Sequence, residues 1–151
     1  MGFGQSGNRG PRLEHEYLML LVDTNIWLKF YWRMPLPAKL EESLTQDTLA
    51  LSPVSVLEAA TLIRKGRLPG IRPIGEWLAS ALNGYVVAQL TPEIASSAGA
   101  DPWEHQDPAD RLLVHSAKAL GYTLVHTDTV IRKRKDLSQF YFKLSKPHEA
   151  T

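Results

Sequence analysis

The sequence predicts an α/β protein built on a central, mostly parallel sheet of four to five strands. Three observations support this fold class: short apolar runs recur along the chain, segments with helical spacing separate them, and proline or glycine stands at several of the boundaries. Strands that alternate with helices form βαβ units, in which successive strands run parallel. No internal repeat or second domain is expected.

The first expected strand is the apolar run Leu18–Val22, which is typical of a strand buried on both faces. Helical segments follow over 25–33 and 37–46. Pro35 and Pro37 separate them, because proline interrupts a helix.

The remaining elements continue this alternation, with glycine or Asn-Gly as helix stops and proline near helix starts. In order, they are a strand at 49–51, a helix from Ser55 to Gly66, a helix from Pro73 to Leu82, a strand at 85–88, a helix from Pro92 to about Ala98, a helix from Pro108 to Gly121, a strand at 122–125 and an edge strand at 139–143.

The composition fits one globular domain. The chain has 151 residues, a hydrophobic content of 44%, a net charge of +1 and no cysteine, so disulfides and thiolate metal sites are excluded. No apolar run is long enough to span a membrane, and we expect a cytoplasmic protein. Residues 17–146 are expected to form the domain and 147–151 a tail. Residues 1–16 are interpreted as a disordered leader, an expression tag or an overlong gene start, with Met19 as an alternative start.

Four acids are expected to converge on one crevice. Asp23 follows the first strand and Asp128 follows the fourth, while Glu58 and Asp110 lie in the first turns of their helices. In open α/β sheets, ligands gather beyond the carboxyl ends of the strands, and helix starts face the same crevice. The sequence therefore predicts an acidic pocket there.

Each acid also has a structural interpretation. Asp23 and Asp107 are suited to cap helices, and Ser55-x-x-Glu58 has the form of a capping box. Asp110 would then occupy the third helical position, where the dipole favours an acid, and Asp128 suits a turn. Taken one at a time, Glu58, Asp107 and Asp128 favour the structural interpretation. Taken together, the acids favour a site.

The chemistry of such a pocket favours a divalent cation. Clustered carboxylates raise one another's pKa, and a cation removes that penalty. Oxygen ligands without a histidine–cysteine set indicate Mg²⁺ or Mn²⁺ rather than Zn²⁺. This chemistry suits phosphodiester hydrolysis, because the ion activates water and stabilises the leaving oxygen.

The region from Leu18 to about Lys143 resembles a PIN domain, and within that family the VapC-type toxins of type II toxin–antitoxin pairs. The matching segments are LLVDTNIWL at 20–28, LSPVSVLEAA at 51–60, KGRL at 65–68 and HQDPADRLLVHSAKALGYTLVHTD at 105–128. The resemblance implies a three-layer α/β/α fold and a Mg²⁺- or Mn²⁺-dependent endoribonuclease with Asp23, Glu58, Asp110 and Asp128 as its catalytic metal ligands. It also implies an RNA substrate, a VapB-type antitoxin and a homodimer.

Several residues depart from the family pattern or support it. His126 stands where Thr or Ser is frequent, and either it or Thr127 is expected to hydrogen-bond a phosphate or a metal-bound water. Asn25 is interpreted as orienting such a water or as a helix start, and Asp107 as a cap first and a ligand second. His115 is expected on a polar face or at an interface, and His105 in a loop, with a direct catalytic role the less favoured alternative.

Two short basic runs follow the acids and are candidates for phosphate contacts, although such runs are more often solvated faces. The candidate RNA contacts are Arg64, Lys65, Arg111, Arg132 and Lys133. Arg111 has a second interpretation, an ion pair with an acid. Trp27, Tyr31 and Trp32 suit base stacking, but their helical spacing favours a core or a partner interface.

Two other functions stay open on the sequence alone. The same site would serve another phosphate substrate, such as structured DNA or a phosphomonoester. A non-catalytic PIN-like scaffold, whose acids only cap helices, is the third hypothesis.

Overall fold

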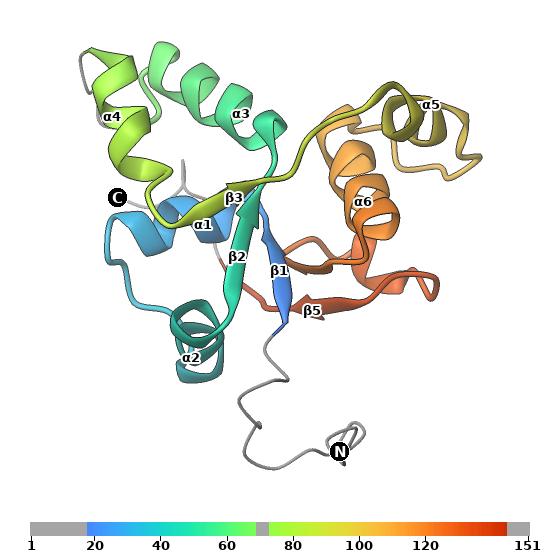
Figure 1. Ribbon diagram of the computed structural model, residues 1–151, viewed down its shortest axis with the longest axis horizontal. Helices are drawn as coiled ribbons and strands as arrows, with labels where there is room; N and C mark the ends of the chain where they lie inside the picture. The colour runs from blue at the N-terminus through green and yellow to red at the C-terminus, as the bar shows by residue number, and fades with distance from the viewer. Residues whose placement is uncertain (1–17, 69–72, 145–151) are drawn as a thin grey trace.

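A parallel sheet forms the centre of the protein, with helices on both faces (Figure 1). The computed structural model describes residues 18–68 and 73–144. In this part of the chain, five strands lie in the order β3-β2-β1-β4-β5, and each neighbouring pair is parallel. The strands are β1 (Met19–Val22), β2 (Thr48–Leu51), β3 (Tyr85–Val87), β4 (Thr123–His126) and β5 (Gln139–Tyr141). The predicted fold class is confirmed, including the edge strand. The segments predicted as leader (1–16) and tail (147–151) lie outside the described residues.

The helices cover the sheet as two groups. In Figure 1, α1 and α2 lie on one side of the strands and α5 and α6 on the other. The helices are α1 (Thr24–Tyr31), α2 (Ala38–Gln46), α3 (Pro53–Arg64), α4 (Ile74–Ala81), α5 (Pro92–Ala100) and α6 (Pro108–Leu120), and a short 3₁₀ turn, η2 (Ile131–Lys133), follows β4. No helix among the described residues is long and apolar enough to cross a membrane.

The strand β1 is buried on both faces, as the continuous apolar run predicts. Leu20 and Val22 pack in one core cluster with Trp27 of α1. Leu21 packs in the other with Leu113 of α6. Successive side chains of a strand point to opposite faces, so this short strand joins the two cores.

The helix α3 begins earlier than predicted. Ser52 is its N-cap, accepting a hydrogen bond from the Val54 N–H (3.0 Å), and Pro53 occupies the first helical position. The predicted start at Ser55 and the capping box Ser55-x-x-Glu58 are therefore wrong. Glu58 lies in the second turn, where its carboxylate is not needed by the helix end.

The strand order places a topological switch point between β1 and β4. From β1 the chain proceeds to β2 and β3 on one side and then returns to β4 on the other. Val22 pairs with Val125, and the Asp23 N–H donates to the Val125 carbonyl (3.0 Å). The residues that follow these two strands are therefore neighbours at the carboxyl edge of the sheet, where α/β folds bind ligands.

The aromatic residues of α1 pack inside the protein. Trp27 is fully buried, and its indole N–H donates to the Ala81 carbonyl (2.9 Å). Tyr31 and Trp32 are partly buried against Trp77 of α4, with ring centroids 6.0 Å apart in each pair. Base stacking by Trp27 is excluded, and the core interpretation is confirmed.

Leu21→Ala is expected to lower the free energy of unfolding by about 2–5 kcal/mol, because it removes a fully buried side chain from the core between β1 and α6. Urea denaturation followed by circular dichroism measures this change. Leu57→Ala is the matched control, since Leu57 is 64% exposed and its truncation should change stability by no more than about 0.5 kcal/mol. Equal losses in the two variants would contradict the two-sided packing of β1.

Candidate active site

One cavity of about 550 Å³ opens at the carboxyl edge of the sheet, and all four predicted acids line it. They come from four separate segments: the end of β1, the second turn of α3, the first turn of α6 and the turn after β4. The polar and charged lining residues are Asp23, Thr24, Asn25, Glu58, Thr61, Lys65, Arg67, His105, Asp107, Asp110, Thr127 and Asp128. The predicted convergence is therefore what the fold produces.

Asp23 links the two central strands through its side chain. One carboxylate oxygen caps α1 by accepting from the Ile26 N–H (2.8 Å). The other accepts from the Thr127 N–H (3.0 Å) and lies 3.4 Å from the Thr127 hydroxyl. Asn25 donates to that same hydroxyl (3.3 Å). Asn25 and Thr127, both predicted as supporting residues, are thus tied to Asp23.

Glu58 is held by the first turn of α1. The Thr24 hydroxyl donates a short hydrogen bond to its carboxylate and lies 2.8 Å from the Ser55 hydroxyl. Thr24 and Ser55 are buried, so this contact also fixes α3 against α1. Ser55, placed in a capping box by its sequence pattern, instead supports Glu58 from within α3.

The other acids lie at two helix starts. Asp107 caps α6 by accepting from the Ala109 N–H (2.9 Å), and Asp110 occupies the third helical position. Both placements agree with the sequence prediction. One oxygen of Asp128 accepts from the N–H groups of Val130 (2.7 Å) and Ile131 (3.0 Å), so Asp128 starts the η2 turn.

His105 lies in the loop between α5 and α6, as predicted, and its side chain lines the cavity. Its Nε2 lies 2.7 Å from Asp110 Oδ2 and 3.6 Å from Asp128 Oδ2. The only signal in the sequence was its spacing, two residues before the helix cap and five before Asp110. That spacing has meaning only when the loop conformation is known.

Arg111 determines the loop conformation. Its guanidinium donates to the backbone carbonyls of Ala98 (2.9 Å), Trp103 (2.8 Å) and His105 (2.7 Å), and makes a short hydrogen bond to that of Asp101. The prediction that Arg111 contacts RNA is wrong, and so is the alternative ion pair with an acid, because these carbonyls occupy the guanidinium.

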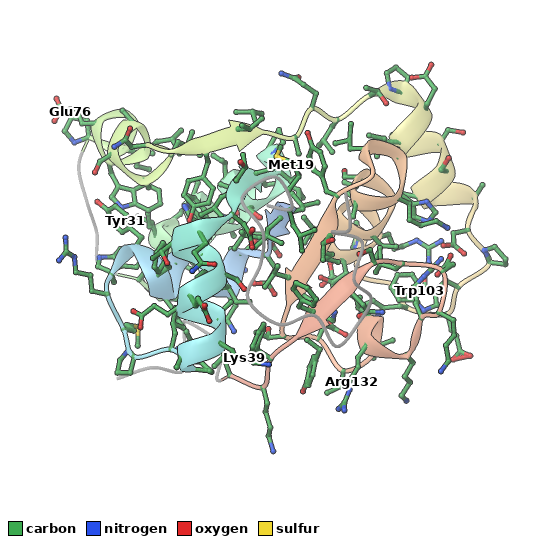
Figure 2. All side chains as sticks on the ribbon, turned by 60° about the horizontal axis from the view of Figure 1, so that its bottom comes forward. Met19, Tyr31, Lys39, Glu76, Trp103 and Arg132 are labelled. Atoms are coloured by element: carbon green, nitrogen blue, oxygen red, sulfur yellow. The ribbon has the colours of Figure 1, made fainter. Side chains whose placement is uncertain are left out.

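A charged cluster holds the far side of this loop. Asp101 accepts from Arg134 (2.8 Å) and lies 2.7 Å from Nε2 of His115. The Arg134 guanidinium also packs over the Trp103 ring, at 4.5 Å from its centroid. Figure 2 shows Trp103 on the side of the molecule opposite Tyr31 and Glu76. His115 is buried, so the predicted polar-face position is wrong.

His126 points away from the cavity. It is fully buried, with Nε2 2.6 Å from Gln139 Oε1, and its Nδ1 accepts from the Asp128 N–H (3.1 Å). Its predicted contact with a phosphate or a metal-bound water is wrong. The strand β4 extends to His126, one residue beyond the predicted end, and the alternation of the strand turns this side chain inward.

The basic residues divide into two groups. Lys65 and Arg67, which follow α3, line the cavity together with the acids and are exposed. Arg64, Arg132 and Lys133 are exposed but do not line it. The Arg132 guanidinium lies over the Tyr141 ring, 4.6 Å from its centroid, and Figure 2 shows Arg132 at the margin of the molecule.

The acids of the cavity differ in pKa because their surroundings differ. Burial raises the pKa of Asp23 to about 7, although the hydrogen bonds that its carboxylate accepts from the N–H groups of Ile26 and Thr127 act to lower it. Burial raises the pKa of Asp110 to about 7 as well, with further repulsion from Asp107 and Asp128.

For Glu58, burial and the charge of Asp107 both raise the pKa. Asp128 shows the opposite balance. Burial acts to raise its pKa, but hydrogen bonds from Ile131, Asp110 and Val130 bring it below the ordinary value. At Asp23, Glu58 and Asp110, negative charge is therefore costly without a cation.

The donor set of the cavity fits a divalent metal ion. The carboxylates supply hard oxygen ligands, which Mg²⁺ and Mn²⁺ prefer. In the described part of the chain, one group of three metal-ligating side chains has its ligand atoms within 4.8 Å of one another, namely His105, Asp110 and Asp128. Asp23 and Glu58 lie in the same cavity, where the charge of Glu58 adds to the raised pKa of Asp23.

The raised pKa of Asp110 makes stability depend on pH. Because the fold favours the neutral carboxyl group, the stability it contributes is present below about pH 4 and is lost as the pH rises towards 7. In chelator, Asp110→Asn is expected to be more stable than the wild type at pH 8, by on the order of a few kcal/mol, and equal to it at pH 4. Urea denaturation at the two pH values measures this.

Asp136→Asn provides the control of opposite sign. Arg134 and Lys118 lower the pKa of Asp136, so this variant should lose stability at pH 8. If Asp110→Asn did not gain stability at pH 8, the ionised carboxylate of Asp110 would not destabilise the folded protein.

Known proteins resemble this chain in sequence and in fold. The PIN domain family model matches residues 20–137. Ribonuclease VapC22 of Mycobacterium tuberculosis is 30% identical over 122 residues, which cover 77% of this chain and 92% of that protein.

Two solved structures share the fold at low sequence identity. VapBC2 from Rickettsia felis, bound to a DNA fragment from their promoter, has a TM-score of 0.63 at 16% identity, and the match covers 83% of this chain and 100% of that one. FitAcB from Neisseria gonorrhoeae has a TM-score of 0.54 at 18% identity, covering 81% and 96%. The sequence matches, which span most of the described residues, establish that the chain belongs to the PIN domain family, within its VapC group.

Proposed function

We propose that this protein is a divalent-metal-dependent endoribonuclease that acts as the toxin of a type II toxin–antitoxin pair. The observation that carries the proposal is the single cavity in which four acids from distant segments meet, with two basic side chains among its lining residues. The relative at 30% identity is named a ribonuclease, and the fold is that of a VapBC protein. These similarities support the same reaction and a VapB-type antitoxin as partner.

In this mechanism, Asp23, Glu58, Asp110 and Asp128 would hold the ion, Mg²⁺ or Mn²⁺. When bound, the ion activates water and offsets charge that develops on the phosphate. The residues around the acids fix their positions: Thr127 and the α1 backbone hold Asp23, Thr24 holds Glu58, and the η2 backbone holds Asp128. Rigid placement of this kind lets the charge act without reorganisation.

The basic side chains of the cavity bring RNA to an otherwise repulsive pocket. Lys65 and Arg67 are exposed and follow the helix that carries Glu58. Their charges attract the phosphates of an RNA strand at the cavity. Arg64, Arg132 and Lys133 remain candidates for contacts farther along the strand, and a homodimer, as in the family pattern, would extend this surface.

Asp23→Asn and Glu58→Gln are each expected to reduce the cleavage rate of a defined RNA panel by at least about 100-fold, because each removes a negative charge that holds the ion. Chelation of divalent metal should have the same effect on the wild type. Glu76→Gln is the control: Glu76 is an exposed acid on α4, which Figure 2 shows at the far end of the molecule.

Circular dichroism of each variant establishes that it is folded. Wild-type cleavage by folded Asp23→Asn protein would refute the metal-dependent mechanism. Cleavage of structured DNA but not of RNA would support the same metal site with DNA, in place of RNA, as its substrate.

Lys65→Ala and Arg67→Ala are expected to raise the KM for RNA several-fold, to leave kcat nearly unchanged, and to reduce the slope of binding against salt concentration by about one counterion each. Lys39→Ala is the matched control, since Lys39 is an exposed lysine on α2, outside the cavity. Fluorescence anisotropy with a short RNA at several salt concentrations measures the slopes. If Lys65→Ala and Lys39→Ala gave equal slopes of RNA binding against salt concentration, Lys65 would not contact the RNA.

A further inference from the structure

His105 is the one imidazole among the described residues that lines the acidic cavity. Its side chain is 19% exposed, and its Nε2 faces two carboxylates, at 2.7 Å from Asp110 Oδ2 and 3.6 Å from Asp128 Oδ2. In this structure Nε2 shares a hydrogen bond with Asp110 Oδ2, whereas the tautomer protonated on Nδ1 would offer a lone pair on Nε2 to a cation placed between these groups. A nitrogen donor and two oxygen donors therefore share one small volume.

The spacing of these three atoms suits one coordination sphere. Around an octahedral ion with bonds of about 2.1 Å, neighbouring ligand atoms lie about 3 Å apart. The two distances from His105 Nε2 lie on either side of this value, and all three ligand atoms fall within 4.8 Å of one another. These separations are compatible with three ligands of one ion.

The loop that carries His105 is built to hold it in place. Arg111 donates to the His105 carbonyl (2.7 Å) and to three other carbonyls of the same turn and the end of α5. The Trp103 ring packs against the imidazole, with centroids 4.9 Å apart, and the Arg134 guanidinium lies over the Trp103 ring. A ligand that is fixed before binding loses little freedom when an ion arrives.

We propose that His105 is a direct nitrogen ligand of the ion and that it shifts the preference of the site from Mg²⁺ towards Mn²⁺. Mg²⁺ takes oxygen ligands almost exclusively, whereas first-row transition ions accept imidazole nitrogen as well. The inference rests on the proposed function, because it requires an ion among these carboxylates. It goes beyond that function by adding a ligand and a metal preference.

Electron spin-echo spectroscopy of the protein loaded with Mn²⁺ alone tests the bond directly, because a coordinated imidazole gives a ¹⁴N modulation. The wild type should show this signal and His105→Gln should lose it. Glutamine keeps an N–H donor for Asp110. If His105 only positioned Asp110, glutamine would therefore replace it without loss of metal binding. His115→Gln is the matched control: His115 makes the same 2.7 Å contact to an aspartate, Asp101, away from the cavity, and this variant should keep the signal.

Calorimetric titration gives the second measurement. His105→Gln is expected to weaken Mn²⁺ binding by at least about tenfold, the smallest effect usual for residues that support metal sites, while Mg²⁺ binding changes little. Bound Mn²⁺ without ¹⁴N modulation, or equal losses for the two ions, would overturn the role of His105 and leave the proposed function standing. Failure of the wild type to bind either ion would overturn both.

Discussion

The burial of several carboxyl groups at one edge of the sheet is the constraint on which the rest of the site depends. Parallel pairing of β1 with β4 brings Asp23 beside Thr127, and α3 and α6 add their acids to the same cavity. Like charges in a buried place repel, so the fold provides hydrogen-bond donors from protein groups around them. A carboxylate has about four acceptor positions, and Asp23, although bonded through both oxygens, still has room to bind an ion.

Much of this arrangement could be predicted from the sequence because it follows from regular structure. A continuous apolar run predicts a strand buried on both faces, and parallel strands end at one edge, so acids placed just after such strands must be neighbours. Asp23 and Asp128 follow from this reasoning. Asp110 follows from the helix start at Asp107-Pro108, which is a strong local signal. None of these inferences requires knowledge of loop conformation.

The residues that sequence reasoning placed incorrectly lie where one residue of shift, or one loop, decides the outcome. A strand that ends at His126 rather than at Val125 turns the imidazole into the core. A helix that begins at Pro53 turns Ser55 from a cap into a buried contact of Thr24. His105 lies in a loop, as predicted, but its place in the cavity depends on the loop conformation, in which Arg111 donates to the His105 carbonyl, and this packing has no periodic pattern in the sequence.

The structural and the functional interpretations of the acids describe one arrangement. Asp23, Asp107 and Asp128 each cap a helix or turn and also line the cavity. A backbone N–H that caps a helix start lowers the pKa of the carboxylate that accepts it, and this effect keeps Asp128 below its ordinary value in spite of burial. Where burial prevails, as at Asp23, the N–H donors still act against the rise. Helix capping is therefore the means by which this fold holds negative charge ready for a cation. Loss of the hydrogen bonds between the backbone N–H groups and these carboxylates would change the electrostatics of the site before it changed the shape of the site.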